Sequence, residues 1–332
     1  MSTIAADTTQ HAVAEEARKG LTATPRYLSP WLFYDAAGSH LFEQITAIPE
    51  YYLTRTERSI FAAHADEIIQ QAVGGTTQPL TLIELGAGTA TKTGILLSAA
   101  VRQQGTVVYQ PVDVSETALT QASENILSNI PGVTVRCQVV DYTRESLPLD
   151  RLRNTRTLAL YIGSSIGNFA PAEAESILRN LRAQLQPSDS LLLGVDLVPG
   201  PEKPIATLLA AYDDAAGVTA AFNRNILGRL NRDLGADFRP ATFRHQAIWN
   251  AVASRIEMHL VSLTPQAVHI PTNSAGPALT LNFAPGDAIH TENSYKFTAT
   301  AVHHLLEAAG FTPLESWYDE RRWFAVTLAT AV

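Results

Sequence analysis

The sequence predicts an α/β protein with a parallel, doubly wound sheet and an inserted α+β segment. From Gln78 to Val198, apolar runs of roughly four to eight residues alternate with helical patterns of roughly ten to fifteen residues, which is typical of buried parallel strands and their crossover helices. A Pro- and Gly-rich stretch, PGPEKP, then ends this alternation, and longer strand patterns follow it.

The composition is that of a globular protein. Hydrophobic residues make up 46% of the 332 residues and charged residues 17%, below the roughly 25% usual in soluble domains. The net charge of −8 argues against nucleic-acid or anionic-membrane partners. We find no apolar run of about 18 residues and no secretory signal pattern. Cys137 is the only cysteine, which excludes an internal disulfide and a thiolate-rich metal site. We expect a cytoplasmic monomer.

The N-terminal region precedes the alternating pattern. Its first twenty residues are polar with scattered alanines and predict a loose helix or arm. From Arg26 to Ile69 aromatic residues and prolines are frequent, as in YLSPWLFYDAAGSHLF and AIPEYYLTRTERSIF. Composition alone favours a helical cap whose aromatic side chains form core.

The expected elements of the sheet follow in order. Strands are expected at PLTLIEL, TVVYQPVD, VTVRCQVVD, TRTLALYI and SLLLGVDLV, with helices at TATKTGILLSAAVRQQG, ETALTQASENILSNI and PAEAESILRNLRAQL. After them come one or two helices, long strands such as HQAIWNAVASRIEMHLVSLT, one more helix and a closing hairpin. We therefore predict a sheet domain with its aromatic cap over 20–200, an inserted α+β domain over 201–290, and the completion of the sheet domain over 291–332.

Three strand ends carry residues suited to a nucleoside. Ligands of open α/β sheets bind beyond the carboxyl ends of the strands. The first strand ends in ELGAGT (84–89), a glycine turn before a helix. Asp113 ends the second strand and suits a ribose diol, while Asp141 and Tyr142 follow the third and suit the adenine amino group and ring. Each acid alone could instead cap a helix. Together they indicate an S-adenosylmethionine pocket.

Two other classes of site fit the sequence less well. A nicotinamide fingerprint is disfavoured because Thr91 replaces its third small residue and no acid follows at the usual spacing of about 20 residues. The segment GSSIG (163–167) fits the nucleophile elbow of α/β-hydrolases, with Ser165 as nucleophile and Asp196 and His245 as partners. This alternative would leave the glycine turn without a role.

Over nearly its whole length the chain resembles the bacterial L-histidine Nα-methyltransferases of the ergothioneine pathway. Matching segments are PEYYLTRTE, ELGAGTATKT, GSSIGN, RIEM, TENSYKF and the long, highly specific AYDDAAGVTAAFNRN. The resemblance implies a Rossmann-like methyltransferase sheet with an inserted substrate domain. It also implies successive transfer of three methyl groups from S-adenosylmethionine to the α-amino nitrogen of histidine, giving hercynine. An N-methyltransferase for another amino acid, such as a tryptophan derivative, is the nearest alternative.

The resemblance also implies roles for single residues. Cofactor binding is expected at Tyr34, Gly86, Lys92, Asp113, Asp141 and Tyr142. The amino and carboxylate groups of the substrate are expected at Tyr51, Asn168 and Tyr212, which are the expected catalytic residues, with Gly163 and Met258 also in the substrate site. The imidazole is expected at Glu292 and Ser294. The chain departs from the family pattern in SPWLFY, where a Lys usually precedes the aromatic tract, and at Tyr142, where Phe is expected.

Glu292 and Ser294 share one face if their segment is extended. A carboxylate and a hydroxyl on one face suit the two ring nitrogens of an imidazole. A capping pair for the next helix is the alternative. Met258 suits either the ring or the core. No metal site is expected, since His303 and His304 are adjacent and point apart on a helix, and no HExxH pattern occurs.

Overall fold

The chain folds into two compact units. The computed structural model describes residues 3–76, 78–88, 90–142 and 152–332, so Thr89 of the predicted glycine turn lies outside the described residues. One unit, the sheet unit, comprises Tyr52–Pro204 and Tyr295–Val332, and the other, the insert unit, comprises Met1–Tyr51 and Ile205–Ser294. The chain therefore passes between the units at 51/52, at 204/205 and at 294/295.

The sheet unit contains the predicted parallel sheet, which confirms the fold class. Its strands are β1 (Leu80–Leu85), β2 (Val107–Asp113), β3 (Val133–Val135), β4 (Gln138–Val139), β5 (Arg156–Tyr161), β6 (Ser190–Asp196), β12 (Phe311–Tyr318) and β13 (Phe324–Ala331). Their order is β12-β13-β6-β5-β1-β2-β3, with β4 also paired to β2. The β1, β2, β3, β5 and β6 neighbours pair in parallel, whereas β13 pairs antiparallel with both β6 and β12.

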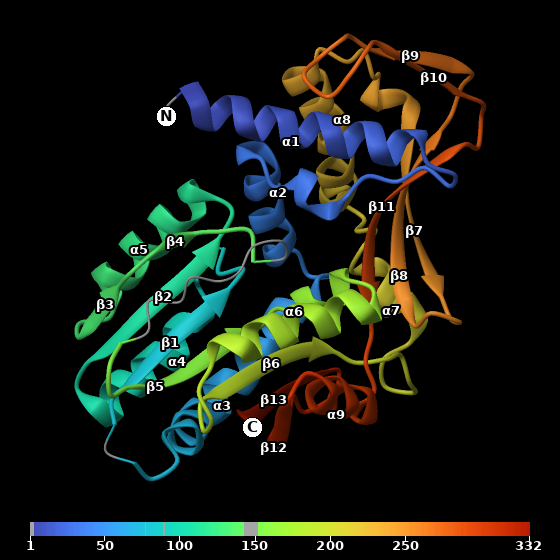
Figure 1. Cartoon of the computed structure of the whole chain (residues 1–332). Coiled ribbons are helices and arrows are strands. Elements are labelled where there is room, and N and C mark those ends of the chain that lie inside the picture. The colour runs from blue at the N-terminus through green and yellow to red at the C-terminus, as the bar shows by residue number, and fades with distance from the viewer. Residues whose placement is uncertain (1–2, 77, 89, 143–151) are drawn as a thin grey trace. The chain divides into compact units, whose positions relative to one another are not determined.

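Helices cover both faces of this sheet (Figure 1). They are α3 (Tyr52–Val73), α4 (Thr93–Gln104), α5 (Glu116–Asn129), α6 (Pro171–Gln184) and α9 (Ala299–Ala308), with the short 3-10 helix η2 (Ser165–Asn168) after β5. Alternate residues of the central strands, such as Ile83 and Leu85, pack with side chains of α6 and α9 in one core cluster. Every residue of β1 and β6 is buried, as expected of parallel strands covered on both faces.

The third predicted strand, VTVRCQVVD, is interrupted. Both of its parts, β3 and β4, pair with β2 in the same register, Val107 with Val133 and Val112 with Gln138. Pro111 lies in the stretch of β2 between these two paired segments and has no N–H to donate. The break in the third strand therefore follows from a residue of its neighbour.

The insert unit has the predicted α+β character. Its helices are α1 (Thr3–Thr22), η1 (Pro30–Phe33), α2 (Ala36–Ala47), α7 (Ile205–Ala210), α8 (Val218–Leu234) and η3 (Pro240–Thr242), and its strands are β7 (Phe243–Asn250), β8 (Arg255–Ser262), β9 (Gln266–Ile270), β10 (Leu279–Phe283) and β11 (Ala288–Tyr295). They form the sheet β11-β8-β7 and the hairpin β9-β10. The long strand pattern HQAIWNAVASRIEMHLVSLT is two antiparallel strands, β7 and β8.

The part of the N-terminal aromatic segment up to Tyr51 packs within the insert unit, although its sequence position suggested a cap of the sheet domain. Phe33 stacks on Phe222 of α8 with ring centroids 4.5 Å apart. The Arg229 guanidinium donates to the Leu32 carbonyl over 2.9 Å, and the Asn225 amide donates to the Asp35 carboxylate over 2.8 Å. These contacts join segments about 200 residues apart in the chain. As functional domains, the division at 200/201 and 290/291 stays a prediction.

Candidate active site

The glycine turn after β1 and the acid that ends β2 are joined directly. Gly86 has φ +66° and Gly88 has φ +53°, values that favour glycine. The Gly86 N–H donates to the Val112 carbonyl over 2.8 Å, and the Gly88 N–H donates to the Asp113 carboxylate over 3.1 Å. The Ser115 N–H donates to the other carboxylate oxygen over 2.9 Å. Two predicted cofactor residues are therefore brought together.

The Asp113 carboxyl lies in a largely buried position. Burial raises its pKa, while the N–H groups of Ser115 and Gly88 act in the opposite direction. Each carboxylate oxygen accepts at least one backbone N–H, and the two oxygens of a carboxylate together offer about four acceptor positions. A ribose diol, which offers two neighbouring hydroxyl donors, matches such a carboxylate.

Tyr142 lies against the glycine turn. A Cβ atom on Gly86 would stand 3.0 Å from the Tyr142 hydroxyl oxygen, so any larger residue would have to displace this hydroxyl. The Tyr142 ring packs edge-to-face on Tyr161, with centroids 5.7 Å apart and planes at 82°. Asp141 directly precedes Tyr142 at the end of the third strand and is half-buried. The strand-end residues of β1 and of the third strand therefore lie at one edge of the sheet.

Glu57 of α3 is a site residue that sequence reasoning missed. Its fully buried carboxylate forms an ion pair with the Lys92 ammonium and accepts the Gly163 N–H over 2.8 Å. A Cβ atom on Gly163 would lie 3.2 Å from the Lys92 nitrogen. Glu57 thus connects a predicted cofactor residue with a predicted substrate residue. Its segment, PEYYLTRTE, belongs to the resemblance, but a single Glu in a helical pattern gave no signal of its own.

The turn after β5 presents Asn168. Ser164 adopts φ +61°, and η2 then runs from Ser165 to Asn168, which is partly exposed. A Cβ atom on Gly167 would lie 2.8 Å from the Tyr295 carbonyl oxygen, so the turn requires glycine at this position. The last residue of the GSSIGN segment is therefore held by a close approach of two backbone segments.

The hydrolase alternative lacks its catalytic partners. The Ser165 hydroxyl donates to the Ile162 carbonyl over 3.2 Å. The Asp196 carboxylate pairs with lysine ammonium groups rather than with a histidine. His245 Nδ1 is hydrogen-bonded to the Asn223 amide, and His245 Nε2 is hydrogen-bonded to the Tyr212 carbonyl, each over 2.8 Å. Neither proposed partner is available to activate a nucleophilic serine.

Three predicted site residues of the insert unit belong to one aromatic cluster. Tyr34 packs edge-on against Phe42, with ring centroids 5.9 Å apart. Phe42 packs edge-on against Tyr51 at 6.3 Å, and Tyr51 packs in the same way against Tyr212 at 6.2 Å. Phe42 and Phe222, which also contacts Tyr34 at 6.0 Å, were not predicted as part of this cluster. Their apolar rings looked like ordinary helix core in the sequence.

Tyr212 is held through both its hydroxyl and its backbone. The hydroxyl shares a 2.7 Å hydrogen bond with the Ser294 hydroxyl. The Tyr212 carbonyl accepts from His245 Nε2 over 2.8 Å. Burial lowers the pKa of His245, which favours the neutral ring. The Asn223 amide nitrogen at Nδ1 and the Tyr212 carbonyl at Nε2 place the proton of that ring on Nε2. His245 therefore serves as a support for a predicted substrate residue.

Glu292 and Ser294 lie on the extended strand β11, as the spacing argument requires. They are not a capping pair, because α9 begins at Ala299 and its N-cap is Thr298, whose hydroxyl accepts the Ala301 N–H over 3.1 Å. Met258 of β8 is buried, with 2% of its surface exposed. β8 and β11 are neighbours in one sheet, which places Met258 and the predicted imidazole-binding residues on adjacent strands.

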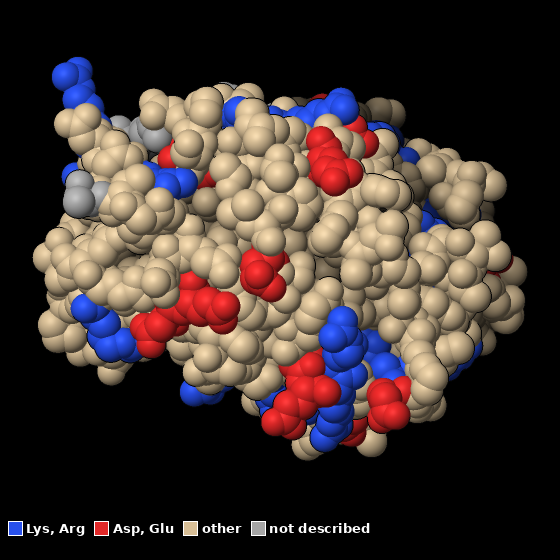
Figure 2. Space-filling model, turned by 90° about the horizontal axis from the view of Figure 1, so that it is seen from below, with Lys and Arg blue, Asp and Glu red and all other residues tan. Residues whose placement is uncertain are grey.

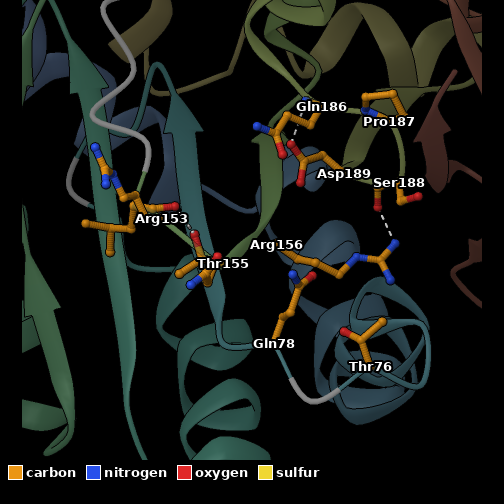
Figure 3. Close-up of a pocket in the computed structure, with 11 residues that line it drawn as sticks. Thr76, Gln78, Arg153, Thr155, Arg156, Gln186, Pro187, Ser188 and Asp189 are labelled. Carbon is orange, nitrogen blue, oxygen red and sulfur yellow. Dashed lines mark hydrogen bonds between the residues drawn. The ribbon is translucent and has the colours of Figure 1, made fainter.

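A pocket of about 540 Å³ lies at the opposite end of the sheet (Figure 3). Its lining includes Arg156, the first residue of β5, and Asp189, which precedes β6. Arg156 donates to the carbonyls of Val73 and Ser188, and Asp189 accepts the N–H groups of Thr157 and Gln186. None of the predicted site residues lines this pocket, and the side chains of Arg156 and Asp189 bind backbone groups.

The described residues contain no group of three or more His, Cys, Asp or Glu side chains placed to hold a metal ion. Within the same part of the chain, no helix has the length and apolar character needed to cross a membrane. Figure 2 shows one face of the molecule, on which basic and acidic side chains lie side by side. Uncharged residues and histidines form most of this face.

Comparisons with known proteins identify the family. The sequence model described as "Histidine-specific methyltransferase, SAM-dependent" matches residues 13–331. A histidine N-alpha-methyltransferase of Mycolicibacterium smegmatis is 42% identical over 326 residues, covering 98% of this chain and 97% of the relative. Another histidine N-alpha-methyltransferase, from Mycobacterium tuberculosis, is 40% identical over 319 residues, covering 96% of this chain and 94% of the relative. A 4-dimethylallyltryptophan N-methyltransferase of Claviceps purpurea is 24% identical over 331 residues, covering 94% of this chain and 92% of the relative. The chain belongs to the family of histidine-specific, S-adenosylmethionine-dependent methyltransferases.

Proposed function

We propose that the protein methylates the α-amino nitrogen of L-histidine three times, forming hercynine in the first step of ergothioneine biosynthesis. The observation that carries the proposal is the extent of the family match, which spans 13–331 and so includes both the sheet unit and the insert unit. The two histidine N-alpha-methyltransferases cited above share at least 40% of their aligned residues with this chain.

The sheet unit is proposed to bind the methyl donor. Asp113 would accept hydrogen bonds from the ribose hydroxyls, and Tyr142 would stack on the adenine while Asp141 accepts from its amino group. At Gly88 a Cβ atom would meet nothing within 4 Å, so the turn has open space beside it. Gly86 and Lys92, with Tyr34 of the insert unit, complete the proposed set. S-adenosylmethionine supplies an activated methyl group on a sulfonium.

The insert unit and η2 are proposed to bind the amino acid. Asn168 would donate from its amide to the carboxylate, beside the backbone of Gly163. Tyr51 and Tyr212 would bind the amine and stabilise the growing alkylammonium by cation–π attraction. Glu292 would accept from one ring nitrogen of the imidazole and Ser294 would pair with the other. A site built on these bonds should reject side chains that lack them.

Positioning explains most of the proposed catalysis. The amine nitrogen forms a bond to the methyl carbon as the carbon–sulfur bond breaks, and sulfur keeps the electron pair. A peptide α-amine has a pKa of about 7.7–8.0, and the carboxylate of a free amino acid raises this value, so the bound amine must lose a proton before it attacks. The enzyme then mainly has to hold the reacting atoms about 3–3.5 Å apart and in line. Each methylated ammonium must lose its proton before the next transfer.

Mass spectrometry tests the proposal. The protein is incubated with L-histidine and S-adenosylmethionine, and the expected product is histidine that has gained three methyl groups at the α-nitrogen. Phenylalanine and 4-dimethylallyltryptophan serve as competing substrates. Methylation of the tryptophan derivative without methylation of histidine would assign the chain to another amino acid. We also propose that the enzyme acts as a cytoplasmic monomer, which sedimentation and fractionation test.

A further inference from the structure

The carboxylate of Asp196, the last residue of β6, is bound by three side chains within the sheet unit. The Tyr52 hydroxyl donates to its oxygens over 3.0 and 2.8 Å. The Lys203 ammonium lies 2.7 Å from one oxygen and the Lys296 ammonium 2.8 Å from the other. All four residues are at least 96% buried. We call this group the Asp196 cluster.

The three partners come from the three places where the chain changes units. Tyr52 is the first residue after the crossing at 51/52, Lys203 stands two residues before the crossing at 204/205, and Lys296 is the second residue after the crossing at 294/295. A single carboxylate therefore binds one residue from each crossing. Two of these residues adjoin proposed substrate residues, since Tyr51 precedes Tyr52 and Ser294 lies two positions before Lys296.

Backbone bonds fasten the same segments to the end of β6. The Phe297 N–H donates to the Asp196 carbonyl over 3.0 Å, and the Val198 N–H donates to the Phe297 carbonyl over 3.0 Å. Lys203 closes a tight turn with Gly200 and also donates from its side chain to the Trp323 carbonyl over 3.0 Å. The crossings therefore leave the sheet unit from points held by both main chain and side chains.

The Asp196 cluster also reaches the turn that presents Asn168. The Asp196 N–H donates to the Ser164 hydroxyl over 2.9 Å, and the Ser164 N–H donates to the Gly194 carbonyl over 3.2 Å. Ser164 follows Gly163, so the end of β6 fixes the start of the segment that contains two proposed substrate residues.

Stability alone is a weak reason for such a cluster. The cluster places a carboxylate and two lysine side chains in a buried position, and desolvation of buried ions often cancels their attraction. Burial would raise the pKa of Asp196, but the ammonium groups of Lys296 and Lys203 lower it below its usual value, so the carboxylate stays charged. Buried charged groups of this kind are better explained by a specific arrangement that they impose.

We propose that Asp196 is a positioning residue for methyl transfer, which fixes the departure points of all three crossings and thereby the placement of Tyr51 and Ser294. This inference rests on the proposed function, since it assigns those two residues to the amino-acid substrate. Asp196 is not among the residues proposed to bind either reactant. Its loss should therefore impair the transfer step rather than the binding of the cofactor, whose proposed residues lie largely at the ends of β1, β2 and the third strand.

The test compares Asp196→Asn with Asp189→Asn. Asp189 is equally buried, with 2% exposure, but its carboxylate binds the Thr157 and Gln186 N–H groups at the start of β6 (Figure 3). Three quantities are measured for each variant: the melting temperature, the affinity for S-adenosylhomocysteine, and the single-turnover rate of histidine methylation. We expect both variants to melt earlier. Only Asp196→Asn should lose at least tenfold in rate, with affinity for S-adenosylhomocysteine changed less than threefold.

A milder variant keeps the inference testable if Asp196→Asn does not fold. Tyr52→Phe keeps the buried ring and removes only the hydroxyl donor, and we expect it to lower the single-turnover rate about threefold with unchanged cofactor affinity. Rates within twofold of the wild type in the foldable variants would overturn the inference, as would a parallel loss of S-adenosylhomocysteine affinity. Failure of the wild-type protein to methylate histidine would instead overturn the proposed function.

Discussion

Replacement of Gly86 by alanine tests the cofactor site most directly. Gly86 has φ +66°, and a left-handed conformation costs an L-residue about 1–2 kcal/mol. The new Cβ atom would also stand 3.0 Å from the Tyr142 hydroxyl oxygen, closer than most Cβ contacts. Tyr142 must then shift from the turn, and with it the ring proposed to stack on adenine. A loss of about 1.4 kcal/mol in binding would weaken the affinity for the cofactor tenfold.

Gly105 provides a matched control. It follows the last residue of α4 and has φ +80°, and a Cβ atom there would meet nothing within 4 Å. Gly105→Ala therefore also places an L-residue at positive φ, but without displacing a side chain. We expect both variants to lose about 1–2 kcal/mol of unfolding free energy in urea titrations. Only Gly86→Ala should weaken S-adenosylhomocysteine binding, measured by isothermal titration calorimetry.

Two results would refute this reasoning. If Gly86→Ala bound S-adenosylhomocysteine as tightly as the wild type, the turn and Tyr142 would not belong to the cofactor site. If both variants lost affinity equally, the effect would come from general destabilisation of the sheet unit. In either case the proposed stacking of Tyr142 would have to be abandoned.

Four further predictions concern single side chains. Glu57→Gln should lower the unfolding free energy by about 2–3 kcal/mol, because it removes the buried ion pair with the Lys92 ammonium. An unchanged urea midpoint would contradict this. Ser294→Ala should raise the KM for histidine about three- to tenfold. Adding Tyr212→Phe to this variant should raise the KM little further, since both substitutions remove the same 2.7 Å hydrogen bond. Glu292→Ala should reduce the preference for histidine over phenylalanine, measured by competition, far more than the affinity for S-adenosylhomocysteine; intact discrimination would disprove the role. Burial raises the pKa of Glu84 from 4.5 to about 7, so the folded state prefers the protonated carboxyl, and the resulting stability is lost as the pH rises from about 4.5 through 7. Over this range the unfolding free energy of Glu84→Gln should therefore rise by about 3 kcal/mol relative to that of the wild type. A difference between the two proteins that does not change with pH would refute this prediction.

The sequence predicted the centre of the sheet because the determinants there are local. Strands such as β1 and β6 are buried throughout and read as continuous apolar runs. The glycine turn and Asp113 could be placed together since the carboxyl ends of neighbouring parallel strands meet at one edge. The same reasoning failed for the third strand, whose break is explained by Pro111 in a different strand.

Long-range packing limited the rest. Nothing in the segment around Phe33 indicates that it packs on α8, because the contact joins residues far apart in sequence. Glu57 and Asp196 likewise look like ordinary polar residues, and their partners lie up to 144 positions away. The extended state of Glu292 and Ser294 was one of two alternatives, and the extent of β11 and the position of the Thr298 cap decide between them.

The discontinuous make-up of the insert unit has a consequence for engineering. Residues 205–294 share their core with residues 1–51, through pairs such as Phe33 and Phe222. Deleting the internal segment alone would expose those aromatic rings to water, and grafting it alone from a relative would create mismatched rings at that contact. Chimeras made to alter amino-acid preference should therefore exchange both segments at once, and junctions at the three crossings would keep the Asp196 cluster intact.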